Sequence, residues 1–198
     1  MMKYSNHVNN EPINKQINGF TLIELLVTIS ILAIAMAIAI PNMSTFISKL
    51  RVDNEISQLN RLILTARNTA INYEASTTIC PLDNNNNCTN DWTGVISVFV
   101  DNDGDGSMEA GDNDTVIRVK EGIQQGDSLL YGQASLRYNQ MGTILGGVSA
   151  TPFRYCPEGH VDLNRGIIVA ASGRSFATTD TDNDDKDEDR LGNEISCI

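Results

Sequence analysis

The sequence predicts an α+β fold in which one long N-terminal helix packs on a head of antiparallel β-sheet. Three observations predict this fold. An apolar run at residues 20–40 contains Glu24 as its only charged residue. Beyond Pro41, apolar residues recur at three- and four-residue steps, which indicates a second helical stretch. From residue 77 onward, short β-prone runs alternate with turn sequences, and no βαβ rhythm is present.

Residues 20–40 have the length and composition of a membrane-spanning helix. At about 1.5 Å per residue this run reaches about 31 Å, enough to cross a hydrocarbon core. A secretory signal peptide fits poorly, because the preceding 19 residues are polar and Asn-rich and no small-residue cleavage site follows. A carboxylate in such a helix costs about 2–3 kcal/mol, and less near the interface. Glu24 therefore lies at headgroup depth or has a cationic partner, and cleavage after Gly19 would create one at the α-amine of Phe20.

The helix is expected to continue as an amphipathic segment over residues 41–73. Proline removes a helix hydrogen bond, so we expect a bend near Pro41. Polar residues of this segment, Arg51, Asp53, Arg61 and Arg67, are expected to face water. The apolar stripe that should pack on the head consists of Val52, Ile56, Leu59, Ile63, Ala66 and Ala70.

The remaining residues, 74–198, are expected to form the β-rich head. Turn-forming sequences such as "DNNNN", "DNDGDG" and "SG" separate the β-prone runs. Regular short strands of this kind predict an antiparallel sheet. The expected strands are residues 77–80, 94–100, 115–120, 128–132, 135–139, 152–156, 166–171 and 174–178.

Four cysteines all follow the apolar run: Cys80, Cys88, Cys156 and Cys197. An even number of cysteines behind a membrane-crossing start indicates two disulfides in an oxidising compartment. Three pairings are possible, and we favour Cys80 with Cys88 and Cys156 with Cys197. A zinc site is the alternative, but CxxC spacing is absent and His160 is the only nearby histidine.

One acidic loop has the oxygen spacing of a calcium loop, which makes Ca²⁺ the candidate cofactor. Carboxylates fall at its positions 1, 3, 5, 9 and 12, and Gly106 stands at position 6 for the sharp turn. It departs from an EF-hand in its aspartate at position 12 and its strand-like flanks. The alternative is an acidic hairpin held by Asp and Gly turn chemistry without metal. The candidate ligands are Asp101, Asp103, Asp105, Glu109 and Asp112.

A second acidic run lies between Asp180 and Asp189, with seven carboxylates against Lys186. We interpret it as a solvated, mobile loop held near the head by a Cys156–Cys197 bond. A second cation site there is disfavoured, because no glycine stands at the turn position. The chain's net charge of −11 gives no broad attraction to nucleic acid or anionic lipid.

The stretch "GFTLIE", from Gly19 to Glu24, resembles the processing site of type IV pilins and type II secretion pseudopilins. This resemblance implies that a prepilin peptidase removes the leader, residues 1–19, and that Phe20 becomes N-methylated. It also implies that Glu24 pairs with the N-terminus of an adjacent subunit during assembly.

The head resembles FimT/GspH-like minor pilins and pseudopilins, with an A-R-x-x-A-I helix end, a C-P…C…W-x-x-G segment and an acidic F-x-D-x-D-x-D-G segment. The resemblance implies the type IV pilin fold and a structural subunit of a type II secretion pseudopilus that contributes to protein secretion. The alternative is a FimT-like minor pilin of a type IV pilus, acting in pilus assembly, adhesion or DNA uptake. The matching residues are Ala66, Arg67, Ala70, Ile71, Cys80, Pro81, Cys88, Trp92, Gly94, Phe99, Asp101, Asp103, Asp105 and Gly106.

The resemblance also implies partners and a location. The partners are other pilin subunits, the prepilin peptidase/N-methyltransferase and an inner-membrane assembly platform. The protein is expected to cross the inner membrane once with its head in the periplasm, and then to enter a periplasmic pseudopilus or extracellular pilus. No enzyme is expected, since HExxH, phosphate-binding glycine loop and GxSxG motifs are absent.

Nucleic-acid binding is not expected. FimT-type members can bind DNA through a C-terminal G-R-x-R element, and this sequence has Gly173 and Arg174 but Phe176 in place of the second arginine. Phosphate binding requires clustered cations, and the acidic run follows directly. Arg174 is the one candidate DNA contact, and its alternative role is a salt bridge at a strand end.

Overall fold

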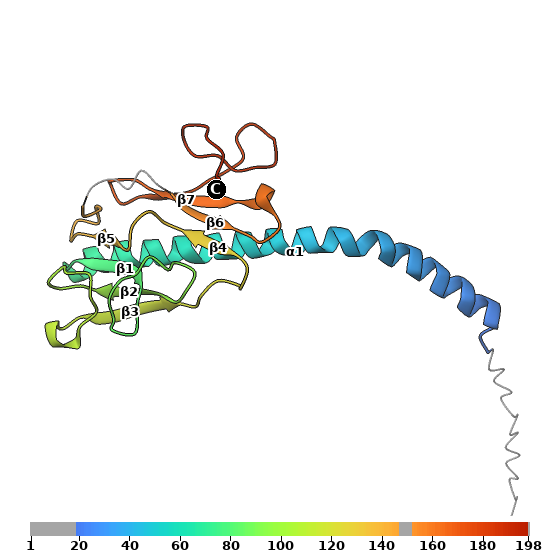
Figure 1. Ribbon diagram of the computed structural model, residues 1–198, viewed down its shortest axis with the longest axis horizontal. Helices are drawn as coiled ribbons and strands as arrows, with labels where there is room; N and C mark the ends of the chain where they lie inside the picture. Colours follow the sequence, from blue (N-terminus) through green and yellow to red (C-terminus); the bar gives the residue numbers. More distant parts are fainter. Residues whose placement is uncertain (1–18, 147–151, 198) are drawn as a thin grey trace, which may run out of the picture. The chain divides into compact units, whose positions relative to one another are not determined.

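The computed structural model describes residues 19–146 and 152–197, which divide into two compact units between Asn42 and Met43. One helix, α1 (Leu22–Tyr73), is assigned continuously through both units and confirms the long helix predicted from the sequence (Figure 1). The bend expected near Pro41 concerns the placement of one unit against the other and stays a prediction.

In the first unit, the segment Leu22–Ile40 is long and apolar enough to cross a membrane, with a mean hydropathy of 2.6 and no residue buried. Its hydroxyls are satisfied within the helix: Thr28 donates to the carbonyl of Leu25 at 2.8 Å, and Ser30 donates to that of Leu26 at 2.7 Å. Such internal bonding suits an apolar solvent. A helix that is apolar all round needs lipid or other helices to cover it.

In the second unit, two antiparallel four-stranded sheets form the head. The first has the order β3-β2-β1-β5 and the second β4-β6-β7-β8. Two short 3₁₀ helices, η1 (Ala110–Asp112) and η2 (Val161–Leu163), lie in the connections. The strands are β1 (Thr77–Pro81), β2 (Ile96–Val100), β3 (Thr115–Lys120), β4 (Ser128–Leu130), β5 (Leu136–Tyr138), β6 (Phe153–Cys156), β7 (Arg165–Val169) and β8 (Ser175–Ala177).

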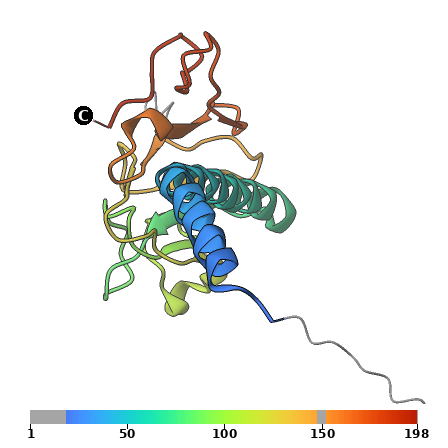
Figure 2. The same cartoon turned by 90° about the vertical axis from the view of Figure 1, so that its right-hand side faces the viewer.

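Each strand agrees with its predicted run to within two residues at either end, but the head has two sheets where the sequence led us to expect one. The head half of α1 lies between them (Figures 1 and 2). This placement buries more of the helix than the predicted stripe, because Leu62 and Thr69 are buried as well. Side chains of α1 and of both sheets belong to one hydrophobic core.

Trp92 is the largest side chain of that core and is 1% exposed. Its ring meets Tyr131 and Phe153 edge to face, at centroid distances of 5.2 and 5.0 Å, and those two rings stack on each other. The indole Nε1–H donates to the carbonyl of Gln133 at 2.9 Å. The ring of Trp92 therefore packs against aromatic side chains, and its N–H group is hydrogen-bonded.

Three of the residues predicted to face water are instead partly buried and bonded, because the two sheets enclose the helix. Arg67 donates to the carbonyls of Gly142 at 3.0 Å and Ser172 at 3.4 Å, which joins two turns of the head. Arg61 is exposed, as predicted. One turn of α1 supplies three ion pairs to the head: Arg51 with Asp127 (3.2 Å), Glu55 with Lys120 (2.7 Å) and Asp53 with Arg165.

Two disulfides join the four cysteines, in the pairs that the sequence favoured. Cys80 of β1 bonds to Cys88 in the following loop, with their Cα atoms 5.4 Å apart. Cys156 of β6 bonds to Cys197, with a Cα separation of 6.4 Å. The zinc alternative is therefore wrong, since no described cysteine is a free thiol.

Candidate assembly segment and acidic loop

The candidate assembly segment is the start of α1, where Glu24 lies in the first turn. Thr21 precedes the helix, and its Oγ1 accepts the backbone N–H of Glu24 at 3.2 Å, while its carbonyl accepts that of Leu25. Thr21 is thus the N-cap, and Glu24 stands at N3, the spacing of a capping box. The sequence analysis missed this cap, although the T-x-x-E spacing could have identified it.

Glu24 also lies where the helix dipole favours a negative charge, which adds about 0.3–1 kcal/mol at a helix start. These local effects offset part of the cost of placing a carboxylate at the head of an apolar helix. They leave its charge without an ionic partner among the described residues.

Gly19 and Phe20 lie ahead of α1 and are both exposed, with 79% of Phe20 accessible. A side chain at Gly19 would meet nothing within 4 Å in this chain. A requirement for glycine there would therefore come from a protein that binds the site. The predicted leader, except for Gly19, lies outside the described residues.

In the head, the acidic loop between β2 and β3 brings three of its five predicted calcium ligands together. Asp101, Asp103 and Asp105 each offer a carboxylate oxygen within 4.8 Å of the others. Gly104 and Gly106 adopt left-handed backbone, with φ of 77° and 87°, which curls the loop.

Glu109 and Asp112, the other two predicted ligands, do not belong to this cluster. Glu109 lies close enough to Asp112 and Asp105 that their charges raise the pKa of its carboxyl. Both residues come from the segment around η1, where the chain turns back towards β3. Calcium at this loop stays a prediction.

Protein groups already bond much of the loop. Asp101 is buried, accepts the hydroxyl of Thr78 at 2.6 Å and the N–H of Gly104 at 2.9 Å, and has a raised pKa chiefly because of its burial. Asp114, which the sequence analysis did not single out, accepts the N–H groups of Asn102 and Glu109 and closes the loop. These bonds agree with the acidic-hairpin alternative, in which Asp turn chemistry holds the loop.

Arg174, the candidate DNA contact, lies in the turn between β7 and β8. Its side chain is exposed and makes no ion pair with any residue in the described parts of the chain. The strand-end salt bridge considered from the sequence is therefore not formed. The turn itself is held by a bond from the N–H of Ala170 to the carbonyl of Arg174 at 2.9 Å.

Comparison with solved structures finds a pilin of similar architecture. The crystal structure of the type IV minor pilin FimU from Pseudomonas aeruginosa (strain PAO1) matches with a TM-score of 0.52 at 20% identity, over 68% of this chain and 92% of that chain. A second crystal form of FimU matches with a TM-score of 0.47 at 21% identity, over 62% of this chain and 89% of that chain. The first likeness supports the type IV pilin fold, in which a long N-terminal helix packs on antiparallel sheet.

Comparison of the sequence with protein families gives two matches, one in each of the two compact units. Residues 14–40 match the prokaryotic N-terminal methylation motif, and residues 55–173 match the family described as type II transport protein GspH. A search of curated proteins found no match. Since the second match spans more than half of the chain, the protein belongs to the GspH family and is a minor pilin or pseudopilin of the GspH/FimT-like class.

Proposed function

We propose that this protein is a structural subunit of a type II secretion pseudopilus and contributes to protein secretion. The observation that carries the proposal is the match of residues 55–173 to the type II transport protein GspH. The role is one of assembly, in which the head occupies a place in a filament and the helix supplies the filament's interior.

The exposed apolar segment Leu22–Ile40 supports this role, because it can be covered in two successive ways. The segment first anchors the subunit in the inner membrane, with the head in the periplasm. It then leaves the lipid for a bundle of equivalent helices, where packing between apolar side chains replaces contact with lipid. The transfer removes no hydrogen bond from Thr28 or Ser30, since both bond within the helix.

The charge of Glu24 acts in the second step. Cleavage between Gly19 and Phe20 by a prepilin peptidase creates an α-amine, and N-methylation keeps that amine cationic. In the bundle, Glu24 of one subunit pairs with the amine of a neighbouring subunit, which favours the correct axial register. A charge inside an apolar bundle is tolerated when it is paired. The partners are thus other pilin subunits, the processing enzyme and an assembly platform in the inner membrane.

Deletion of the gene tests the function. We expect the deletion strain to lose most secretion of type II exoproteins and to regain it with the wild-type gene on a plasmid. Twitching and transformation, measured in the same strains, are expected to remain normal.

The opposite result, normal secretion with lost twitching or transformation, would replace this proposal by the FimT-like alternative, a minor pilin of a type IV pilus. A strain that carries Arg174→Ala then separates DNA uptake from pilus assembly. Because the second arginine of the DNA-binding element is absent, we expect that substitution to change transformation less than twofold.

A further inference from the structure

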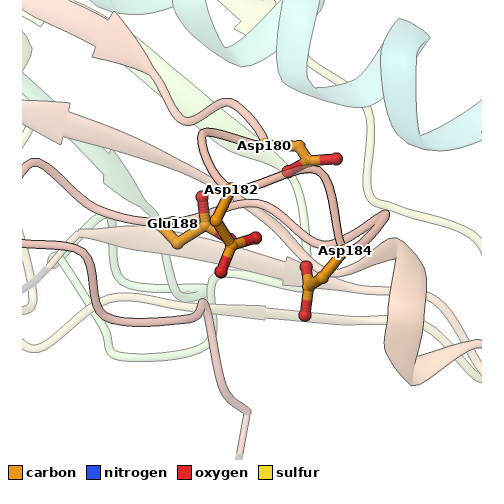
Figure 3. Close-up of side chains that lie close together, drawn as sticks. All are labelled: Asp180, Asp182, Asp184 and Glu188. Carbon is orange, nitrogen blue, oxygen red and sulfur yellow. The ribbon is translucent and has the colours of Figure 1, made fainter.

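The second acidic run is exposed at Asp180, Asp182 and Asp184, as expected of a solvated loop, but its carboxylates converge on the buried Glu188. Asp180, Asp182, Asp184 and Glu188 each offer a carboxylate oxygen within 4.8 Å of the others. Figure 3 shows the four side chains gathered along the loop that follows β8. The cluster lies beyond residues 55–173, the part of the chain that matches the GspH family.

Backbone geometry explains why the carboxylates converge without a glycine. Asn183 and Asp185 adopt left-handed backbone, with φ of 67° and 69°. Asn and Asp tolerate this conformation better than other residues with side chains. The N–H groups of both residues donate to Asp180, at 2.7 and 3.1 Å, so the loop curls around that residue. The missing glycine that disfavoured a site in the sequence analysis is therefore not an obstacle.

Glu188 provides the observation that points to a ligand. The residue is 5% exposed, and its Oε1 is buried and receives no hydrogen bond from any residue that the structure describes. Its Oε2 accepts the N–H and the hydroxyl of Thr181, each at 2.7 Å. Bridges to Thr179 and Glu194 fix its backbone between two neighbouring segments. A buried carboxylate oxygen without a donor is costly, and three further carboxylates beside it add repulsion.

Cations of the protein offset this charge only at Asp184, among the described residues. Lys186 pairs with Asp184 at 3.2 Å and with Glu194 at 2.9 Å, at the edge of the cluster. The guanidinium of Arg190 lies over the ring of Phe176 at 3.5 Å from its centroid. Among the described residues, no basic group lies within 4.0 Å of a carboxylate oxygen of Asp180, Asp182 or Glu188.

We propose that Asp180, Asp182, Asp184 and Glu188 bind one Ca²⁺ ion, which supplies the missing partner of Glu188 Oε1. Oxygens on opposite sides of a Ca²⁺ ion lie about 4.8 Å apart, since each Ca–O distance is about 2.4 Å. The four oxygens therefore fit within a single coordination shell. Hard carboxylate oxygens select Ca²⁺ over softer metals, and backbone carbonyls and water complete its six to eight ligands.

Crowding of the carboxylates agrees with this assignment. The carboxylate oxygens of Asp182, Asp184 and Glu188 lie close enough to repel one another. A divalent cation would relieve that repulsion. It would also link the three aspartates of the loop to Glu188, which lies in the segment that leads to Cys197.

Calcium titration of the full chain in detergent, after EDTA treatment, tests the site. We expect wild type to bind Ca²⁺ with a Kd between about 10⁻⁵ and 10⁻³ M by isothermal titration calorimetry. Glu188→Gln and the exposed Asp182→Asn should each weaken binding at least about tenfold. Asp185→Asn is the matched control, because it removes one charge from the same loop outside the cluster, and its Kd should stay within about twofold.

Thermal unfolding separates a metal site from a merely structural glutamate. In EDTA, Glu188→Gln should unfold at or above the temperature of wild type, because the substitution removes a buried, unpaired charge. In saturating Ca²⁺, wild type should unfold at the higher temperature. An equal amount of Mg²⁺ serves as the control for ionic strength.

Three results would overturn the proposal. One is the absence of Ca²⁺ binding to wild type at about 10 mM, well above the weakest calcium modules. Another is binding that Glu188→Gln and Asp182→Asn leave unchanged but the double change Asp103→Asn/Asp105→Asn abolishes, which would assign the ion to the other acidic loop. The third is a lower unfolding temperature of Glu188→Gln in EDTA.

Discussion

At the scale of single residues, Glu24 has an observed capping position and a proposed pairing role, which one substitution can separate. As the N3 residue behind Thr21, it belongs to a capping position that glutamine also fills. As a charge, it can pair with the α-amine of a neighbouring subunit. Glu24→Gln keeps the first role and removes the second. We expect processing to remain normal and incorporation into sheared filaments to fall at least about tenfold, because an unpaired amine in an apolar bundle costs about 3–5 kcal/mol.

Thr21→Ala is the matched control for that experiment, because it removes the cap and keeps the charge. A lost N-cap costs about 1 kcal/mol, so we expect a smaller decrease in incorporation. Normal incorporation of Glu24→Gln, judged by immunoblots of the sheared and membrane fractions, would contradict the pairing and leave capping as the role of Glu24.

Gly173 is a second residue whose identity the structure explains. Its φ is 78°, and a Cβ atom there would meet the carbonyl oxygen of Gly142 and, at 2.9 Å, the ring of Tyr138. We expect Gly173→Ala to lower the free energy of unfolding by more than the about 1–2 kcal/mol of left-handed strain. Gly192→Ala is the control, since its φ is 82° but nothing lies within 4 Å. Equal losses for the two variants in denaturant unfolding would show that the close approach has no effect.

At the scale of elements, local periodicity in the sequence predicts the positions of the helix and strands. It does not predict which strands pair when they lie far apart in the sequence. The helix and the eight strands follow from apolar spacing and from turn residues, so their predicted ends agree with the structure within two residues at the helix start and at the strands. Two sheets form because β4 pairs with β6 and β1 with β5, and no local pattern encodes these partners. The wider buried face of α1, with Leu62 and Thr69, follows from that pairing.

The ion pairs of α1 differ in burial, and we therefore expect them to contribute unequally to the free energy of unfolding. Asp127 is buried and accepts bonds from the hydroxyl of Tyr155, the N–H of Glu158 and the guanidinium of Arg51. Although burial alone would raise it, these bonds hold the pKa of Asp127 below its usual value. We expect Asp127→Asn to lower the free energy of unfolding by about 2–3 kcal/mol near neutral pH, because it leaves buried donors poorly matched.

The sign of the pKa shift sets the pH dependence of that loss. A carboxyl with a lowered folded pKa stabilises the protein above its unfolded pKa of about 3.9 and loses this effect as pH falls through the lower folded value. The difference between wild type and Asp127→Asn should therefore shrink below about pH 4 in urea unfolding. Asp53→Asn is the control from the same helix turn. Because that ion pair is more exposed, we expect a loss below about 1 kcal/mol, and an equal loss would contradict the role of burial.

At the scale of the whole molecule, the predicted sites fall into a part that local sequence encodes and a part that folding assembles. The proposed processing site and Glu24 are contiguous, so six residues suffice to predict them. The cluster around Glu188 depends on left-handed backbone at Asn183 and Asp185 and on the burial of Glu188 between neighbouring segments. Neither feature has a local sequence pattern, because the turn uses Asn183 and Asp185 in place of glycine.

The two disulfides predict how the end of the chain is held to the rest of the molecule. Cys156–Cys197 closes a separation of 41 residues and Cys80–Cys88 one of 8. In the chain-entropy account these loops contribute about 4 and about 2.5 kcal/mol. We expect alanine in place of Cys156 and Cys197 to speed amide hydrogen exchange at Glu188 and Ile195, whose N–H groups bond to Thr179 and Asp187. Alanine in place of Cys80 and Cys88 is the control and should leave both amides protected. Unchanged exchange in the first variant would mean that the backbone bonds of the C-terminal segment hold it in place without the covalent link.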